Sequence, residues 1–134
     1  MPLAEGQSKR PLRVLIVEDN AATAKLLAML LRTHGYEVQT ASDGSEALRS
    51  AEDRWPDVVL LDIGLPGMDG YQVAERIQSR STNGWKPVLI AMSGHGKCEE
   101  RYRGLAASID RHFIKPIDPL VIIESLQQCV ANRE

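Results

Sequence analysis

The segment LRVLIVEDN, residues 12–20, decides the fold of this 134-residue chain. Residues 12–17 are almost all β-branched or aliphatic, which is typical of a parallel strand covered on both faces. The spacing then becomes helical, because small and aliphatic residues recur at positions 24, 27, 28 and 31 and Gly35 follows as a stop signal. The segment therefore predicts a buried strand followed by a helix that packs back onto the sheet.

The same alternation of strand and helix continues along the chain. Further strands are predicted at residues 36–41, 57–61, 87–92 and 111–114. Five strands alternating with five helices predict an α/β fold of the (βα)5 type, a doubly wound parallel sheet with helices on both faces. The later helices are predicted at residues 43–54, 71–80, 99–107 and 118–131, with Ala47, Leu48, Ala51, Ile122, Leu126, Cys129 and Val130 among their inward residues.

Length and composition limit the classes of function. A chain of this size forms one domain, expected at residues 11–134 after a flexible tail at residues 1–10. The net charge of −2 disfavours direct binding of nucleic acid, and Cys98 and Cys129 have no zinc-binding spacing. No apolar run approaches the roughly 20 residues of a membrane helix, so we expect a cytoplasmic protein without membrane insertion.

Polar residues stand where the predicted strands end. Glu18 and Asp19 follow the first strand, Asp62 the third, Ser93 the fourth and Lys115 the fifth. Each alone has an ordinary explanation, since an acid or serine after a strand often caps a helix and a lysine is usually a surface residue. Together they lie at the sheet edge where ligands of such folds bind. Three neighbouring carboxylates repel one another unless a cation neutralises them, and oxygen ligands alone favour Mg²⁺.

This combination of groups suits phosphoryl transfer, in which positioning and charge stabilisation provide most of the catalysis. A carboxylate can act as the nucleophile and form an aspartyl phosphate, and Asp62 is the candidate because it ends the central strand. Glu18 and Asp19 would hold or orient the metal. Lys115 would pair with phosphoryl oxygens, and Ser93 would donate a hydrogen bond to another oxygen.

Four motifs then resemble the receiver domain of response regulators in two-component signalling. They are VLIVEDN at residues 14–20, VVLLDIGLPGMDGYQV at 58–73, IAMSG at 90–94 and DRHFIKPID at 110–118. Their order and their places on the predicted strands make the resemblance specific over nearly the whole chain. It implies the flavodoxin-like strand order 2-1-3-4-5. The sequences of these motifs are most similar to those of receivers in hybrid sensor histidine kinases and of stand-alone chemotaxis-type receivers.

The resemblance also implies roles for individual residues. Asp62 would be the phosphoacceptor, and Asp19 and Asp62 would ligate Mg²⁺ directly. Glu18 would act through a metal-bound water, and the backbone carbonyl of Gly64 would be a further ligand. The Lys115-Pro116 bond is expected to be cis, which aims the lysine into the site.

Two positions depart from the family pattern. His112 stands where receivers often carry a Tyr or Phe whose ring moves inward on phosphorylation, and residues 107–108 are Ala-Ser where Ala-Gly is common. We expect Ser93 and His112 to carry a switch beneath a mobile loop at residues 94–96. Phosphorylation would then change the face built from the helix at 99–107, the strand at 111–114 and the last helix.

The resemblance predicts a signalling domain rather than an enzyme. Its phosphoryl donor would be a sensor histidine kinase or a histidine phosphotransfer domain, and its output a protein effector or a fused output domain. A nucleotide-dependent oxidoreductase is disfavoured because the acidic loop after the first strand would repel a pyrophosphate. Two alternatives are a phosphatase that forms an aspartyl phosphate and a degenerate receiver that serves only for docking. The phosphatase would need a second Asp where Gly64 stands, and a degenerate receiver would lack the acidic residues.

Overall fold

The chain forms a five-stranded parallel sheet with helices on both sides. The structure is a computed structural model, and it describes residues 11–63, 70–80, 86–93 and 109–132. The spatial order of the strands is β3-β2-β4-β5-β6, which is the predicted order 2-1-3-4-5 counted along the chain. The strands are β2 (Arg13–Val17), β3 (Glu37–Ala41), β4 (Val58–Asp62), β5 (Val88–Ser93) and β6 (Arg111–Ile114), and the helices are α2 (Ala21–Thr33), α3 (Gly44–Asp53), α4 (Gly70–Ser79) and α6 (Pro119–Asn132).

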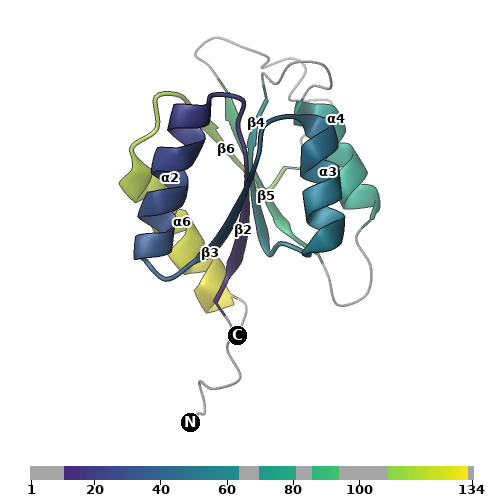
Figure 1. The fold of residues 1–134 in the computed structure, drawn as a ribbon. Coiled ribbons are helices and arrows are strands. Elements are labelled where there is room, and N and C mark those ends of the chain that lie inside the picture. The colour runs from purple at the N-terminus through teal and green to yellow at the C-terminus, as the bar shows by residue number, and fades with distance from the viewer. Residues whose placement is uncertain (1–10, 64–69, 81–85, 94–108, 133–134) are drawn as a thin grey trace.

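The helices form two layers around the sheet. Helices α2 and α6 cover one face, and α3 and α4 cover the other (Figure 1). All described strand pairs are parallel, so the carboxyl ends of the strands lie at one edge of the sheet. The α/β fold class predicted from the sequence is thus confirmed.

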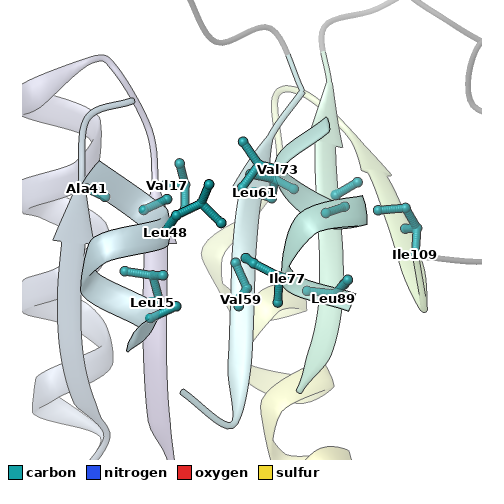
Figure 2. Close-up of a cluster of buried hydrophobic side chains, with 14 of the residues drawn as sticks. Leu15, Val17, Ala41, Leu48, Val59, Leu61, Val73, Ile77, Leu89 and Ile109 are labelled. Atoms are coloured by element: carbon teal, nitrogen blue, oxygen red, sulfur yellow. The ribbon is translucent and has the colours of Figure 1, made fainter. Parts of the chain in front are cut away.

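The central strands are apolar along their length because both of their faces are buried. Side chains alternate between the two faces along a strand. In β2, Leu15 and Val17 belong to the cluster beneath α3 and α4, whereas Val14 and Ile16 belong to the cluster beneath α2 and α6. Figure 2 shows the first cluster, where Leu48 of α3 and Val73 and Ile77 of α4 pack against the sheet; the labelled sheet residues in it include Val59, Leu61 and Leu89.

Local signals fix the ends of the first two helices. The side chain of Asn20 caps α2 by accepting a hydrogen bond from the Thr23 amide, and Asp43 caps α3 in the same way through the Glu46 amide. Gly35, with a φ of 93°, ends the turn after α2 in a conformation that favours glycine.

The predicted elements that fall on described residues agree with the structure except at their boundaries. Strands β2, β3, β4 and β5 each begin one residue later than predicted. Strands β4 and β5 also end one residue later than predicted, so Asp62 and Ser93 are their last residues. The tail at residues 1–10 and the predicted helix at residues 99–107 lie outside the described residues, as does the side chain of Val130.

Candidate functional site

The structure brings the predicted site residues to the carboxyl edge of the sheet. Glu18 and Asp19 directly follow β2, Asp62 ends β4, Ser93 ends β5 and Lys115 directly follows β6. Strands β2 and β4 pair through Val17 and Leu61, which sets the residues that follow them beside each other. The sheet itself therefore positions the site.

Three carboxylates form what we call the acidic cluster: Glu18, Asp19 and Asp62. Ligand oxygens of the three lie within 4.8 Å of one another. Glu18 is only 4% exposed and Asp62 only 7% exposed, whereas Asp19 is exposed. Two buried carboxylates next to a third acid are unfavourable unless cations accompany them.

Lys115 provides a cation to the two buried acids. Its Nζ donates to Glu18 Oε1 at 3.2 Å and to Asp62 Oδ2 at 3.1 Å. Burial lowers the pKa of Lys115, but hydrogen bonds and charge from Asp62 and Glu18 outweigh burial, so the pKa lies above its usual value. The lysine is therefore charged and bound to both carboxylates.

The environment of Glu18 disfavours its charged form. Burial raises the pKa of this carboxyl, and the negative charge of Asp62 raises it further. A hydrogen bond from the Asn20 amide, at 3.1 Å from Glu18 Oε2, and the contact with Lys115 oppose this rise without cancelling it. An additional positive charge beside Glu18 would therefore stabilise its charged form.

The acidic cluster fits a hard divalent cation. It offers only carboxylate oxygens, and one of its members is exposed to solvent, as a site that exchanges its ion requires. The excess of negative charge over the single lysine supports the same conclusion. The predicted fourth ligand, the carbonyl of Gly64, lies outside the described residues.

Ser93 and His112, the predicted switch pair, are in direct contact. Ser93 Oγ lies 3.0 Å from Nε2 of His112, which comes from the neighbouring strand β6. Ser93 is 1% exposed, and burial lowers the pKa of His112.

The predicted cis bond between Lys115 and Pro116 is confirmed. The loop at residues 94–96 and the Ala-Ser pair at 107–108 lie outside the described residues.

Two features of the site were not predicted from the sequence. At Gly70, a Cβ would lie 2.8 Å from the carbonyl oxygen of Asp62 and 2.6 Å from Cα of Ile63, so only glycine fits. The second feature is a groove of about 820 Å³ between α2 and the residues after β6. The groove is lined by Glu18, Thr23, Leu26, Leu27, Leu30, Met92, Lys115, Pro116, Ile117, Pro119 and Ile122.

A sequence signal for the groove exists in α2. Leu26 is 67% exposed and Met29 54% exposed, three residues apart on a helix whose core side is made by Ala24, Ala28 and Leu31. The run LLAMLL is therefore apolar on more than the face that packs on the sheet.

Among the helices that the structure describes, none is long and apolar enough to cross a membrane.

Comparison with known proteins gives a consistent result. Residues 14–127 match the family described as the response regulator receiver domain. The probable transcriptional regulatory protein TcrX of Mycobacterium tuberculosis is 40% identical over 116 residues, which are 87% of this chain and 47% of that protein. The response regulator PleD of Caulobacter vibrioides is 38% identical over 112 residues, 82% of this chain and 24% of that protein. The chain thus spans less than half the length of these relatives.

Solved structures agree with the sequence comparison. A CheY-like receiver domain protein from Methanospirillum hungatei superposes with a TM-score of 0.81 at 28% identity, covering 91% of this chain and 95% of that chain. The chemotaxis protein CheY4 of Vibrio cholerae superposes with a TM-score of 0.79 at 26% identity, covering 89% of this chain and 98% of that one. Both similarities extend over nearly the whole domain.

Proposed function

Since this chain belongs to the response regulator receiver family, the phosphoacceptor domains of two-component signalling, we propose that Asp62 is the residue that accepts the phosphoryl group. The observation that carries this assignment is the position of its carboxylate. Asp62 lies within 4.8 Å of the other acidic ligands and 3.1 Å from Lys115. No other acid in the cluster ends a central strand with the lysine bound to it.

The transfer follows from this arrangement. A carboxylate oxygen of Asp62 attacks the phosphorus of a phosphohistidine, an O–P bond forms, and the N–P bond breaks with its electron pair returning to the imidazole. Lys115, already 3.1 Å from Asp62, neutralises charge on the phosphoryl oxygens. Ser93, at the end of the adjacent strand, donates a hydrogen bond from its hydroxyl to another phosphoryl oxygen. Positioning and charge thus carry the reaction.

Mg²⁺ is the cofactor that the acidic cluster suits. Asp19 and Asp62 would hold the ion directly with the carbonyl of Gly64, and Glu18 would act through a metal-bound water. When bound, the ion neutralises negative charge on the carboxylates and on the incoming phosphoryl group. Lys115 then no longer has to compensate two buried acids alone.

The phosphoryl donor is a sensor histidine kinase or a histidine phosphotransfer domain, and the groove beside Lys115 is where it docks. A donor histidine must reach the carboxyl edge of the sheet, and the groove opens at that edge because Glu18 and Lys115 line it. Leu26, which is 67% exposed and lines the groove, offers apolar surface for a protein partner. A protein effector or a fused output domain receives the signal in the cytoplasm.

The assignment of Asp62 is tested by intact-mass measurement after incubation with Mg²⁺ and a small acyl phosphate. Wild type should gain one phosphoryl group that is labile to base, and Asp62→Asn should gain none. Asp53→Asn, a change at an exposed acid near the end of α3, is the matched control and should be phosphorylated like wild type. Equal phosphorylation of Asp62→Asn and wild type would refute the assignment.

The output face is a separate part of the proposal. Phosphorylation should change the surface built from residues 99–107, β6 and α6, through Ser93 and His112. Amide NMR with Mg²⁺ and the phosphate mimic beryllofluoride would detect the change in β6 and α6. Shifts limited to the surroundings of Asp19, Asp62 and Lys115 would contradict a switch.

A further inference from the structure

The contact between Ser93 and His112 has consequences for the hydroxyl that is to meet the phosphoryl group. Ser93 is 1% exposed, and among the described residues its side chain has one hydrogen-bond partner, Nε2 of His112 at 3.0 Å. The two residues come from adjacent parallel strands, where Ser93 pairs with Ile114 and His112 with Ala91. Rigid sheet backbone on both sides therefore maintains the contact.

The direction of this hydrogen bond follows from the chemistry of the two groups. A serine hydroxyl has one proton to donate, and a buried proton without an acceptor is costly. Burial lowers the pKa of His112, so its ring is neutral at neutral pH and one ring nitrogen can accept. Donation from Ser93 Oγ to His112 Nε2 satisfies the serine proton.

A phosphoryl group on Asp62 needs that same proton. At neutral pH the phosphoryl oxygens carry no proton and can only accept hydrogen bonds. Ser93 has one hydroxyl proton, so it cannot donate a hydrogen bond to the phosphoryl group and to His112 at once. We propose that His112 restrains Ser93 by accepting a hydrogen bond from its hydroxyl, so that the phosphoryl group can receive this hydrogen bond only after the contact with the histidine is broken. This inference rests on the proposed phosphorylation of Asp62, and it gives His112 a role as a positioning residue.

The restraint makes a prediction opposite in sign to that of a purely structural contact. A structural contact supports the site, so its loss leaves binding of a phosphate mimic unchanged or weaker. A restraint opposes binding, so its loss makes binding tighter. Phenylalanine at position 112 removes the acceptor and keeps a planar ring, whereas glutamine keeps an acceptor at a similar distance from the backbone.

The experiment measures the affinity of the full chain for beryllofluoride at saturating Mg²⁺ and neutral pH. His112→Phe should bind about two- to tenfold more tightly than wild type, the range expected for the net contribution of one hydrogen bond. His112→Gln should remain close to wild type. Thermal unfolding of each variant checks that the change in affinity belongs to a folded domain.

A double-mutant cycle isolates the hydroxyl. In a Ser93→Ala background, His112→Phe should have no effect on affinity, because no proton remains to be released. Imidazole ¹⁵N NMR of wild type should show that Nε2 of His112 loses its hydrogen bond when beryllofluoride is added. Unchanged or weaker binding by folded His112→Phe, or the same gain in the Ser93→Ala background, would overturn the restraint.

The outcome separates this inference from the proposed function. If wild type binds beryllofluoride and Asp62→Asn does not, the phosphoacceptor assignment stands whatever the variants at position 112 do. If wild type fails to bind the mimic, both proposals fall together.

Discussion

Two charged clusters stand at opposite edges of the same sheet, and they are built differently. At the amino edge, Arg13 and Glu37 are register partners on β2 and β3, and Arg54, which follows α3, forms an ion pair with Glu37. We call these three residues the amino-edge cluster. Its side chains are one-third to one-half exposed, and its two cations exceed its one acid. The amino-edge cluster is thus an ordinary surface network.

The acidic cluster at the carboxyl edge has the reverse balance. Its three acids are accompanied by one lysine, which pairs with Glu18 and Asp62, and these two acids are almost fully buried. A fold selected only for stability would not place charges in this way, because buried carboxylates without sufficient positive charge weaken the folded state. The difference teaches that excess charge in a buried position, rather than charge itself, marks the functional edge.

The largest effect in this comparison should come from removing the lysine. Lys115→Met leaves Glu18 and Asp62 buried without their cation, so the free energy of unfolding in EDTA should fall by about 1–2 kcal/mol. The loss is moderate because the lysine side chain is 34% exposed and solvent screens part of the interaction. Arg54→Met in the amino-edge cluster is the matched control and should cost less than about 1 kcal/mol. Urea denaturation measures both, and equal losses would break the contrast between the clusters.

Magnesium should stabilise the folded domain through the acidic cluster and not through the amino-edge cluster. At a Mg²⁺ concentration tenfold above its dissociation constant, the free energy of unfolding should rise by about 1.4 kcal/mol, because the ion binds the folded cluster and not the unfolded chain. Removal of the ion with EDTA should reverse the gain. Asp62→Asn should lose most of the effect, whereas Glu37→Gln should keep it. A gain of the same size in Asp62→Asn would show that the ion acts elsewhere.

The carboxyl-edge site could be predicted because it depends on topology. Once the buried runs are recognised as parallel strands, the residues that follow them must share an edge, whatever the details of packing. Topology thus predicted the positions of Glu18, Asp19, Asp62, Ser93 and Lys115 at this edge. The boundaries of several strands were misplaced by one residue, because a periodic pattern does not show which last backbone groups still pair.

Other features depend on tertiary contacts and could not be predicted in the same way. The groove is lined by Leu27 and Leu30 of α2 together with Ile117, a neighbour that no local pattern reveals. The contact between Ser93 Oγ and His112 Nε2 joins side chains on separate strands and depends on their rotamers. Leu26, which is exposed and lines the groove, was a usable signal, since a large apolar residue there exceeds what the core-facing side of α2 requires.

A smaller effect is expected at Asp19, the exposed member of the acidic cluster. Asp19→Asn removes a like charge from beside Glu18 and Asp62, so in EDTA the free energy of unfolding should rise by about 0.5 kcal/mol. Magnesium should bind this variant more weakly than wild type because one carboxylate ligand is lost. Isothermal titration of Mg²⁺ and urea denaturation in EDTA give the two values. A loss of stability in EDTA would mean that Asp19 is a structural partner instead of a source of repulsion.

The smallest effect, and the one that completes the comparison, concerns Glu37. Glu37→Gln removes the acid that pairs with Arg13 and Arg54, so the free energy of unfolding should fall by about 0.3 kcal/mol, as for other partly exposed ion pairs. Salt should shrink this loss and also shrink the gain at Asp19, because both are electrostatic effects near the surface. The two substitutions each remove one acid, yet they should change stability in opposite directions. Urea denaturation in EDTA at low and high salt measures both, and changes of the same sign would mean that the two edges do not differ in their balance of charge.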